Sequence, residues 1–491
     1  MSHRQPLLSS CRSGRSVAVL LAACLLVSDC FLAQVAWGQE TNELQAALTL
    51  QNVLADAIAK AEPSVVAIAR VSKKRMRDDL SDPLSTDFIP NEFGSGLILD
   101  KEGHILTCMH VVRDWENYSF YVWTQQRPFK AVVKAVAKAG DPVTDLAVLK
   151  IEAEDLQPIT FGSADTLKKG HIVIALGNPY GIARHGEASA SWGIVSNLNR
   201  SIRPAADLKT HDASKENLHY YGDLIQVDAR VNFGSSGGAL INLRGELVGV
   251  TTSLAMLSGY ERSGGLAYPV NQTLKNAVES LKQGRQPEFG FLGIGPSDRP
   301  PHERAQGRFG ARVTSLVDGT PASRGGLRLD DIITHVNEQP IYGRDDLMLA
   351  VGGQTAGDQV VLRVQRGGAE RSLPIKLSKK YIAADRPAFS SVEKPAWRGM
   401  QVDDSTAIPP EVLATRAEAI DDQGCVVVTQ VAPDSLAWKA GVRPYTFISH
   451  VGGQRVQTPD EFFRAAARGA GEVALREHAA YGGDVIRTVR P

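Results

Sequence analysis

Short apolar segments rich in Val, Ile and Leu occupy the chain from Ser64 to Val270, separated by turns that contain Gly, Asn and Pro. This pattern predicts short β-strands, and their spacing suits two six-stranded barrels. Helical spacing before this region predicts a helix that stops at Pro63, with the apolar face Leu50, Val53, Leu54, Ala57 and Ile58. A second helix is predicted to end at Gly284, with the apolar face Leu274, Ala277, Val278 and Leu281.

The last third of the chain contains an internal repeat. A series of small and apolar positions returns in the same order, with Ala322, Gly326, Leu327, Ile333 and Val336 matched by Ala437, Gly441, Val442, Ile448 and Val451. Such a repeat indicates that one domain type occurs twice. Between the copies, residues 381–395 are rich in Ala, Pro and Ser, which predicts a linker.

The first 38 residues have the composition of an export signal. Arginines precede an apolar run from Val17 to Val27, and Ala36-Trp-Gly38 provides small residues at a cleavage site. The apolar run is short for a bilayer span. We expect cleavage after Gly38 and a periplasmic or secreted protein. Two alternatives are an uncleaved anchor and lipidation at Cys24.

Length and charge limit the architecture and the partners. At 491 residues the chain is too long for one hydrophobic core. Lys and Arg together number 54, as do Asp and Glu, so the formal net charge is zero. This balance does not indicate a nucleic-acid partner, and we expect a protein partner or substrate.

Cysteine and histidine positions predict neither a structural disulfide nor a metal centre. Of five cysteines, only Cys108 and Cys425 lie beyond the predicted signal, and they fall in different predicted domains. Cys108 is interpreted as a small buried apolar residue, with redox sensing as the alternative. The histidines form no H-E-x-x-H motif and no Cys-x-x-Cys pair occurs, so we expect no metal. We expect no cofactor.

The segment Val231 to Leu240 contains a candidate nucleophile. Its sequence, Val-Asn-Phe-Gly-Ser-Ser-Gly-Gly-Ala-Leu, surrounds Ser236 with glycines that let the backbone bend tightly. One hydroxyl then projects while nearby amides point to the same spot, which is the geometry of an acyl-transfer nucleophile with an oxyanion hole. A plain surface turn is the alternative. We expect the oxyanion hole at Gly234, Ser235 and Ser236, with the amides of Gly234 and Ser236 as the natural donors.

Two upstream residues supply the partners that a serine nucleophile needs. His110 is predicted at the end of the strand within Gly103 to Val112, and Asp145 at the mouth of another strand. A serine hydroxyl needs an imidazole to take its proton, and the imidazole needs a carboxylate to fix its tautomer. Alone, each residue would be interpreted as an ordinary loop side chain. Together, the order His110, Asp145, Ser236 is the chain order of the chymotrypsin architecture.

The chain resembles the HtrA/Deg family of serine proteases from about Leu54 to its C-terminus. Besides the three segments above, the resemblance is carried by Phe93-Gly-Ser-Gly-Leu-Ile-Leu-Asp100, Ala175-Leu-Gly-Asn-Pro-Tyr-Gly181 and Trp192-Gly-Ile-Val-Ser196. The chain departs from the family pattern at Ser235, where Asn is usual, and at Cys108-Met109. Neither departure removes a catalytic group.

The resemblance implies a mainly β fold, a chymotrypsin-like double six-stranded β-barrel followed by two α+β PDZ domains. The triad would lie between the barrels. The expected parts are a signal peptide (1–38), an N-terminal helical segment (39–62), a trypsin-like protease domain (63–284), a first PDZ domain (285–380), a linker (381–395) and a second PDZ domain (396–491).

By the same resemblance, each PDZ copy would bind a C-terminal peptide as an added strand, its carboxylate held by a glycine-containing loop. In the first copy the expected loop is Phe291, Leu292, Gly293 and Ile294. In the second copy, Trp397-Arg-Gly-Met400 places Arg398 where an apolar residue is usual. We therefore expect the second copy to serve assembly or interdomain packing.

Three further expectations come from the resemblance. The pocket for the residue before the scissile bond would include Val231 and Leu254, which suits a small or medium aliphatic side chain, although Arg230 lies near. Arg200 occupies the place of an arginine that relays signals to the oxyanion loop, in a polar stretch predicted from Asn197 to Asp223. A homo-oligomer, a trimer or multiples of it, is expected.

The predicted function is that of an exported, ATP-independent serine endopeptidase that degrades unfolded or damaged proteins, with PDZ domains that bind substrate or activating C-terminal peptides. No Walker-type nucleotide motif occurs. A chaperone or scaffold with little proteolysis and a site-specific signalling protease are the alternatives.

Overall fold

The computed structural model describes nine ranges, residues 43–74, 92–125, 130–178, 188–201, 217–253, 264–383, 389–469, 471–477 and 483–490. The predicted signal and Cys24 lie outside these ranges. The chain divides into two compact units, Met1–Ala57 and Ile58–Pro491. Residues 43–61 form a helix, as the apolar spacing predicts, and Leu44, Leu48 and Leu50 are exposed on it in the single chain. None of the helices in the nine ranges is both long and apolar enough to cross a membrane.

The first barrel has six strands, as predicted. They are β1 (Val65–Ser72), β2 (Glu92–Ile98), β3 (His104–Cys108), β4 (Tyr118–Gln125), β5 (Lys130–Asp141) and β6 (Leu146–Lys150). They follow the order β5-β4-β1-β2-β3-β6, and pairing of β5 with β6 closes the barrel. Its interior is filled by branched aliphatic side chains such as Ile68, Leu97, Ile105 and Leu149, all fully buried.

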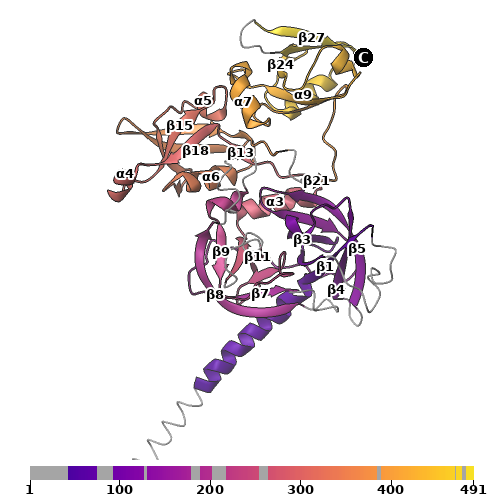
Figure 1. The fold of residues 1–491 in the computed structure, drawn as a ribbon, viewed down its shortest axis with the longest axis vertical. Helices are drawn as coiled ribbons and strands as arrows, with labels where there is room; N and C mark the ends of the chain where they lie inside the picture. The colour runs from indigo at the N-terminus through magenta and orange to yellow at the C-terminus, as the bar shows by residue number, and fades with distance from the viewer. Residues whose placement is uncertain are drawn as a thin grey trace, which may run out of the picture. The chain divides into compact units, whose positions relative to one another are not determined.

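The second barrel, magenta in Figure 1, is also closed and six-stranded. Its strands are β7 (Ile172–Gly177), β8 (Ser189–Arg200), β9 (Leu224–Val227), β10 (Ala239–Ile241), β11 (Leu247–Thr252) and β12 (Gly265–Pro269). They pair in the order β10-β11-β12-β9-β8-β7, and their inward positions form one apolar cluster around Val173, Val195 and Leu240. The mainly β, double-barrel architecture predicted from the sequence is thus confirmed.

Short helical segments join and follow the strands. The 3-10 turns are η1 (Glu62–Ser64), η3 (Met109–Val111) and η6 (Leu218–Tyr221), and helix α3 (Gln272–Lys282) follows the second barrel. The Asn271 side chain caps α3 by accepting a hydrogen bond from the Leu274 amide, and the four predicted apolar residues are buried. The predicted helix before Gly284 is therefore confirmed.

Two modules of one topology follow. The first contains β13 (Gly290–Phe291), β14 (Ile294–Asp298), α4 (Pro301–Ala305), β15 (Ala311–Leu316), α5 (Pro321–Arg324), β16 (Ile332–Val336), β17 (Gln339–Pro340), α6 (Arg344–Gly352), β18 (Gln359–Arg366), β19 (Ala369–Lys376) and β20 (Ser378–Lys379). The second contains β22 (Met400–Asp404), α7 (Pro410–Arg416), η7 (Ala417–Ala419), β23 (Val426–Val431), α8 (Leu436–Lys439), β24 (Phe447–Val451), β25 (Gln454–Arg455), α9 (Pro459–Ala467), β26 (Val473–Glu477) and β27 (Val485–Val489).

The two modules have equivalent sheets, which the sequence repeat predicts. The order β14-β15-β16-β18-β19 in the first matches β22-β23-β24-β26-β27 in the second, with β17 and β25 as equivalent side strands. In each module the amide of the repeated alanine at the short helix, Ala322 or Ala437, donates to a carbonyl of the loop before the edge strand, that of Leu292 or Arg398. The two copies therefore share this backbone hydrogen bond as well as their sequence pattern.

The predicted linker contributes to the first barrel. Within it, β21 (Phe389–Ser390) pairs with β5, with Phe389 opposite Gly140. The Phe389 ring is buried and lies 4.4 Å from the Trp115 ring, measured between centroids. This segment therefore docks on the barrel as an extra edge strand rather than acting only as a spacer.

Candidate active site

His110 and Asp145 meet where two paired strands of the first barrel come together. Strand β3 ends at Cys108, opposite Leu146 at the start of β6. His110 lies just beyond, in the turn η3, and not on the strand as predicted, while Asp145 directly precedes β6. The Nδ1 atom of His110 is 2.6 Å from Oδ2 of Asp145, and the backbone amide of His110 donates to Oδ1 at 3.0 Å. The carboxylate therefore fixes both the ring and the backbone of the histidine.

The Asp145 carboxylate is buried but well supplied with donors. Its backbone has a φ of 54°, a left-handed conformation that is uncommon for a residue other than glycine. Burial would raise the pKa of Asp145, but the charge of His110 and hydrogen bonds from His110 and Tyr268 bring it below its ordinary value. The group is therefore a carboxylate at neutral pH and can orient an imidazole.

Ser236 lies in the tight turn between β9 and β10. Gly234 and Gly237 on either side have φ values of 93° and 85°, which require glycine. The Oγ atom of Ser236 is 2.7 Å from Oγ of Ser253 and accepts a hydrogen bond from the Ser253 amide at 2.9 Å. Within the described ranges, the Nε2 atom of His110 is buried and has no hydrogen-bond partner. The structure therefore holds a formed His-Asp pair and a serine hydroxyl bonded elsewhere.

The predicted oxyanion segment forms a turn. The Ser235 amide donates to the Asn232 carbonyl at 3.0 Å, so this amide is engaged within the turn. In the part of the chain that is described, the amides of Gly234 and Ser236 donate to no main-chain carbonyl. These two amides remain available for an oxyanion.

Ser95, on β2, supports this turn and was not singled out in the sequence. Its Oγ donates to the Gly234 carbonyl at 2.7 Å and accepts from the Asn178 amide at 2.8 Å, while its own amide donates to the Ser236 carbonyl. Ser95 is fully buried. Ser95 therefore links the turn that contains Ser236, in the second barrel, to strand β2 of the first barrel. The only sequence signal was its place within the family-like segment Phe93 to Asp100.

Of the two predicted pocket residues, only Val231 lies within the described ranges. Val231 is largely buried in the apolar cluster of the second barrel, and Leu254 lies outside the described ranges. A cavity of about 170 Å³ beside the nucleophile turn is lined by residues that include Ala190, Arg230 and Ser235. Arg230, noted in the sequence as a complication, thus lines the cavity nearest to Ser236.

The other predicted site residues are placed as follows. Arg200 is the last residue of β8 and is exposed, so the strand continues through the first four residues of the polar stretch predicted from Asn197. In the first module, Phe291 ends β13, Leu292 and Gly293 are buried, and Ile294 begins the edge strand β14. A Cβ atom on Gly293 would lie 2.2 Å from Thr320 Oγ1, so this position needs glycine.

In the second module, Arg398 turns back on its own domain. Its guanidinium donates to the carbonyls of Val489 and Gly471 and lies over the Trp397 ring, 4.5 Å from the centroid. Arg398 and Gly399 both have positive φ, and a Cβ atom on Gly399 would overlap Ser435. Gly399 thus keeps the positive φ of Gly293 in the first copy, whereas Arg398 has a positive φ that its counterpart Leu292 lacks. The arginine side chain is used within its own domain.

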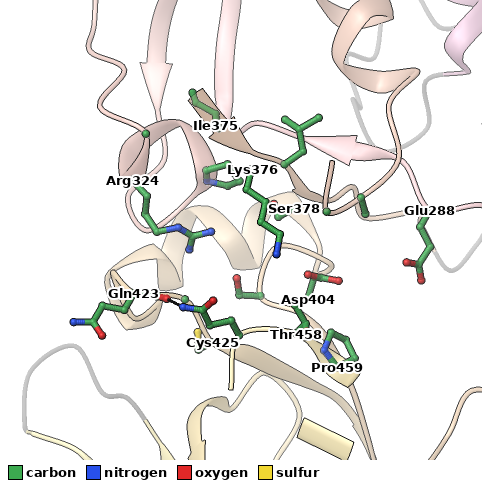
Figure 2. Close-up of a pocket in the computed structure, with 18 of the residues that line it drawn as sticks. Glu288, Arg324, Ile375, Lys376, Ser378, Asp404, Gln423, Cys425, Thr458 and Pro459 are labelled. Atoms are coloured by element: carbon green, nitrogen blue, oxygen red, sulfur yellow. Dashed lines mark hydrogen bonds between the residues drawn. The ribbon is translucent and has the colours of Figure 1, made fainter. Parts of the chain in front are cut away.

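A larger cavity of about 530 Å³ is lined by residues of the two modules. Figure 2 shows polar and charged side chains around it, with Glu288, Arg324 and Lys376 from the first module and Asp404 and Gln423 from the second. None of its lining residues belongs to either barrel. The chemistry of proton transfer is concentrated at His110, so the smaller cavity beside Ser236 is the better candidate for an active site.

One group of potential metal ligands occurs within the described ranges. It consists of Cys108, His110 and Asp145, whose ligand atoms lie within 4.8 Å of one another. Burial raises the pKa of the Cys108 thiol well above its ordinary value, and the charge of Asp145 adds to this. A buried protonated thiol is a poor ligand and a poor redox sensor, so the group is interpreted as the His-Asp pair with an apolar neighbour.

Comparison with known proteins identifies two domain types. The trypsin-like peptidase domain matches residues 94–250, and the PDZ domain matches residues 290–377. The chain is 31% identical over 400 residues to a probable periplasmic serine endoprotease DegP-like of Chlamydia trachomatis, covering 81% of this chain and 73% of the relative. It is 30% identical over 381 residues to the protein of the same description from Pseudomonas putida strain GB-1, covering 76% and 73%.

A solved structure of the HtrA-type protease AlgW with a tripeptide matches with a TM-score of 0.50 and 26% identity, covering 67% of this chain and 98% of the other. The matched trypsin-like domain agrees with the double barrel, and the matched PDZ domain covers the first module. The chain belongs to the HtrA/Deg family and is a serine endopeptidase with a trypsin-like domain followed by PDZ domains.

Proposed function

We propose that the protein is an exported, ATP-independent endopeptidase that degrades unfolded or damaged proteins in the cell envelope, with Ser236, His110 and Asp145 as its catalytic triad. The observation that carries the proposal is the bond of 2.6 Å between His110 Nδ1 and Asp145, which leaves the buried Nε2 atom free of partners within the described ranges. An imidazole held in this tautomer is the base that a serine hydroxyl needs.

In the proposed mechanism, Ser236 Oγ attacks the scissile carbonyl as His110 Nε2 takes its proton. The oxyanion that forms accepts hydrogen bonds from the amides of Gly234 and Ser236. His110 then gives the proton to the leaving amine, and water repeats the sequence in reverse to hydrolyse the acyl-enzyme. Asp145 remains ionised throughout and stabilises the imidazolium.

The selectivity for unfolded substrates follows from the geometry of a protease cleft. A peptide must be extended to reach a nucleophile such as Ser236, which is almost fully buried in a turn. Folded domains do not expose backbone in this form, whereas damaged ones do. Periplasmic location is supported by the relatives named above and by the signal-like N-terminus.

We further propose that the first PDZ module binds C-terminal peptides along β14. This strand is at the edge of its sheet, and the loop Phe291 to Ile294 that precedes it has the glycine geometry of a carboxylate-binding loop. A labelled peptide with a free C-terminus should bind, and the same peptide with an amidated C-terminus should bind at least about tenfold more weakly. Equal affinity would contradict this role. In the second module the bonds of Arg398 favour packing or assembly.

The function is tested with casein, which is largely unfolded, and with a tightly folded protein of similar size. The wild type should degrade casein and spare the folded protein, and Ser236→Ala should degrade neither. If neither the wild type nor Ser236→Ala degraded casein at any temperature, even with C-terminal peptides added, the protease proposal would be wrong. That result would favour a chaperone or scaffold. A single cut in one substrate would favour a signalling protease.

A further inference from the structure

A second layer of buried polar side chains lies behind Asp145. The Tyr268 hydroxyl on β12 is 2.5 Å from Oδ2 of Asp145, the same oxygen that bonds His110, and 3.1 Å from the hydroxyl of Thr252. Burial raises the pKa of Tyr268 well above its ordinary value, and the Asp145 charge adds to this, so the phenol remains a donor. Asp145 is therefore held from two sides, by the imidazole it orients and by a phenol.

The Tyr268 ring is covered by a second histidine. The ring of His219, in η6, stacks on it with centroids 4.0 Å apart and an angle of 15° between planes. His219 is 4% exposed. Its Nδ1 atom is 2.7 Å from the Asp223 carboxylate, and its Nε2 atom is 2.9 Å from the Thr144 carbonyl.

These partners determine the protonation of His219. A carboxylate and a carbonyl only accept hydrogen bonds, so both ring nitrogens must carry a proton to satisfy them. Burial would lower the pKa of His219, but the charge of Asp223 and the hydrogen bonds to Asp223 and Thr144 raise it above its ordinary value. A buried imidazolium thus bonds to Thr144, the residue directly before Asp145 in the chain.

The backbone around this imidazolium is fixed by further bonds. The Asn217 side chain accepts from the His219 amide, and the Leu218 amide donates to the Val143 carbonyl. Both the amide and the hydroxyl of Thr144 donate to Asp141. The segment that contains His219 is therefore attached to the loop that contains Asp145.

We propose that Tyr268 and His219 are positioning residues for the peptidase reaction, which hold the Asp145 carboxylate in place and balance its charge. The proposal rests on the assignment of Asp145 to the triad. A carboxylate whose charge is partly compensated attracts a protonated imidazole less strongly, which favours the neutral form that acts as a base. The charged and titratable groups that face this layer are His110, Cys108, Asp145, Tyr268, His219 and Asp223.

The test measures kcat/KM against pH on an unfolded substrate for wild type, Tyr268→Phe and His219→Gln, with His171→Gln as the control at an exposed histidine of the same domain. Each test variant removes a group that partly compensates the negative charge of Asp145, so the carboxylate attracts a protonated imidazole more strongly. The acid limb should move to higher pH by about 0.5–1 unit, with kcat reduced and KM little changed.

Acid limbs that coincide in wild type and variants would overturn the proposal, even if total activity fell. A readout that needs no turnover is the low-field proton resonance of the His110–Asp145 hydrogen bond, recorded with Ser236→Ala and with Ser236→Ala plus Tyr268→Phe. The resonance should move when Tyr268 loses its hydroxyl, and an unmoved resonance would also overturn the proposal. If this resonance moves while the wild type cleaves nothing, the positioning role stands and the proposed function fails.

Discussion

At the scale of single residues, two acceptors compete for the hydroxyl of Ser236, namely the Ser253 hydroxyl and Nε2 of His110. It now shares a bond of 2.7 Å with the Ser253 hydroxyl, while Nε2 of His110 has no partner within the described ranges. A serine that donates to Ser253 does not donate to the base. In the orientation in which Ser236 donates to Ser253, its hydroxyl must rotate before it can donate to His110.

Ser253→Ala should make Ser236 more reactive. The Ser253 amide still donates to Ser236 Oγ, but the hydroxyl that competes with His110 is gone. The second-order rate of labelling by a fluorophosphonate probe should rise about fivefold, the equivalent of the ~1 kcal/mol of one net hydrogen bond. An unchanged or slower rate would show that Ser253 does not restrain the nucleophile.

Asp404, which lines the cavity in Figure 2, makes stability depend on pH. Burial and the neighbouring Asp403 raise its pKa to about 6. An acid whose pKa is raised in the folded state stabilises the fold while protonated, and this contribution is lost as pH rises through about 6. Asp404→Asn should therefore raise the melting temperature at pH 8 by about 2 °C or more and change it little at pH 4. Exposed Asp422→Asn is the control, and equal effects at both pH values would contradict this reasoning.

The three residues of the proposed triad could be selected from the sequence because each stands in a local motif. Ser236 is flanked by glycines whose positive φ the structure confirms. The roles of Tyr268 and Ser253 could not be predicted. Tyr268 lies in an apolar strand and Ser253 directly follows a strand, and no local motif distinguishes either residue. Tyr268 reaches Asp145 only in the folded chain, where its hydroxyl on β12 of the second barrel meets the carboxylate just before β6 of the first barrel.

At the scale of elements, the strands of the barrels were predictable and their ends were not. His110 was expected on a strand, but β3 stops at Cys108 and a 3-10 turn follows, because the Met109 and His110 amides donate to Asp145 and not to a strand. Similarly, β8 extends to Arg200 through a sequence of polar residues, where pairing with β9 outweighs composition. Tertiary contacts of this kind determine where the strands end, and the local sequence does not reveal them.

The strand β21 was interpreted as part of a plain linker because Ala, Pro and Ser dominate its surroundings. Phe389 and Ser390 nevertheless pair with β5, and a Cβ atom on Gly140 would overlap the Phe389 ring. The absence of a side chain at Gly140 therefore makes room for Phe389. Two residues in a low-complexity segment cannot be recognised as a strand without their partner.

Phe389→Ala should loosen this segment. The ring is buried beside Trp115, so its removal should cost about 2–3 kcal/mol of local stability, at the low end for Phe→Ala because the strand is short. Limited proteolysis should then cut residues 381–395 faster. Val392→Ala, at a residue that is 48% exposed, is the control, and equal cleavage rates in both variants would contradict the docking of β21.

At the scale of the whole molecule, the chain combines a protease domain with two copies of a binding module. The sequence repeat predicted the duplication, and the shared bonds at Ala322 and Ala437 extend it to backbone detail. Arg398 in the sequence led us to expect a different role for the second copy, but its bonds to Val489 and Gly471 could not be predicted, because these residues lie far along the chain. Phe291 of the first loop also packs against the apolar cluster of the second module around Ile420 and Phe447.

The proposed triad, in which His110 takes the proton of Ser236 and Asp145 stays ionised, is tested most directly by identifying the residue that a fluorophosphonate probe modifies. Peptide mapping by mass spectrometry should find the adduct on Ser236 in the wild type, and labelling should fall by at least about a thousandfold in His110→Ala and Asp145→Asn. Labelling of Ser236 at the wild-type rate in both variants, or an adduct on another residue, would contradict the account.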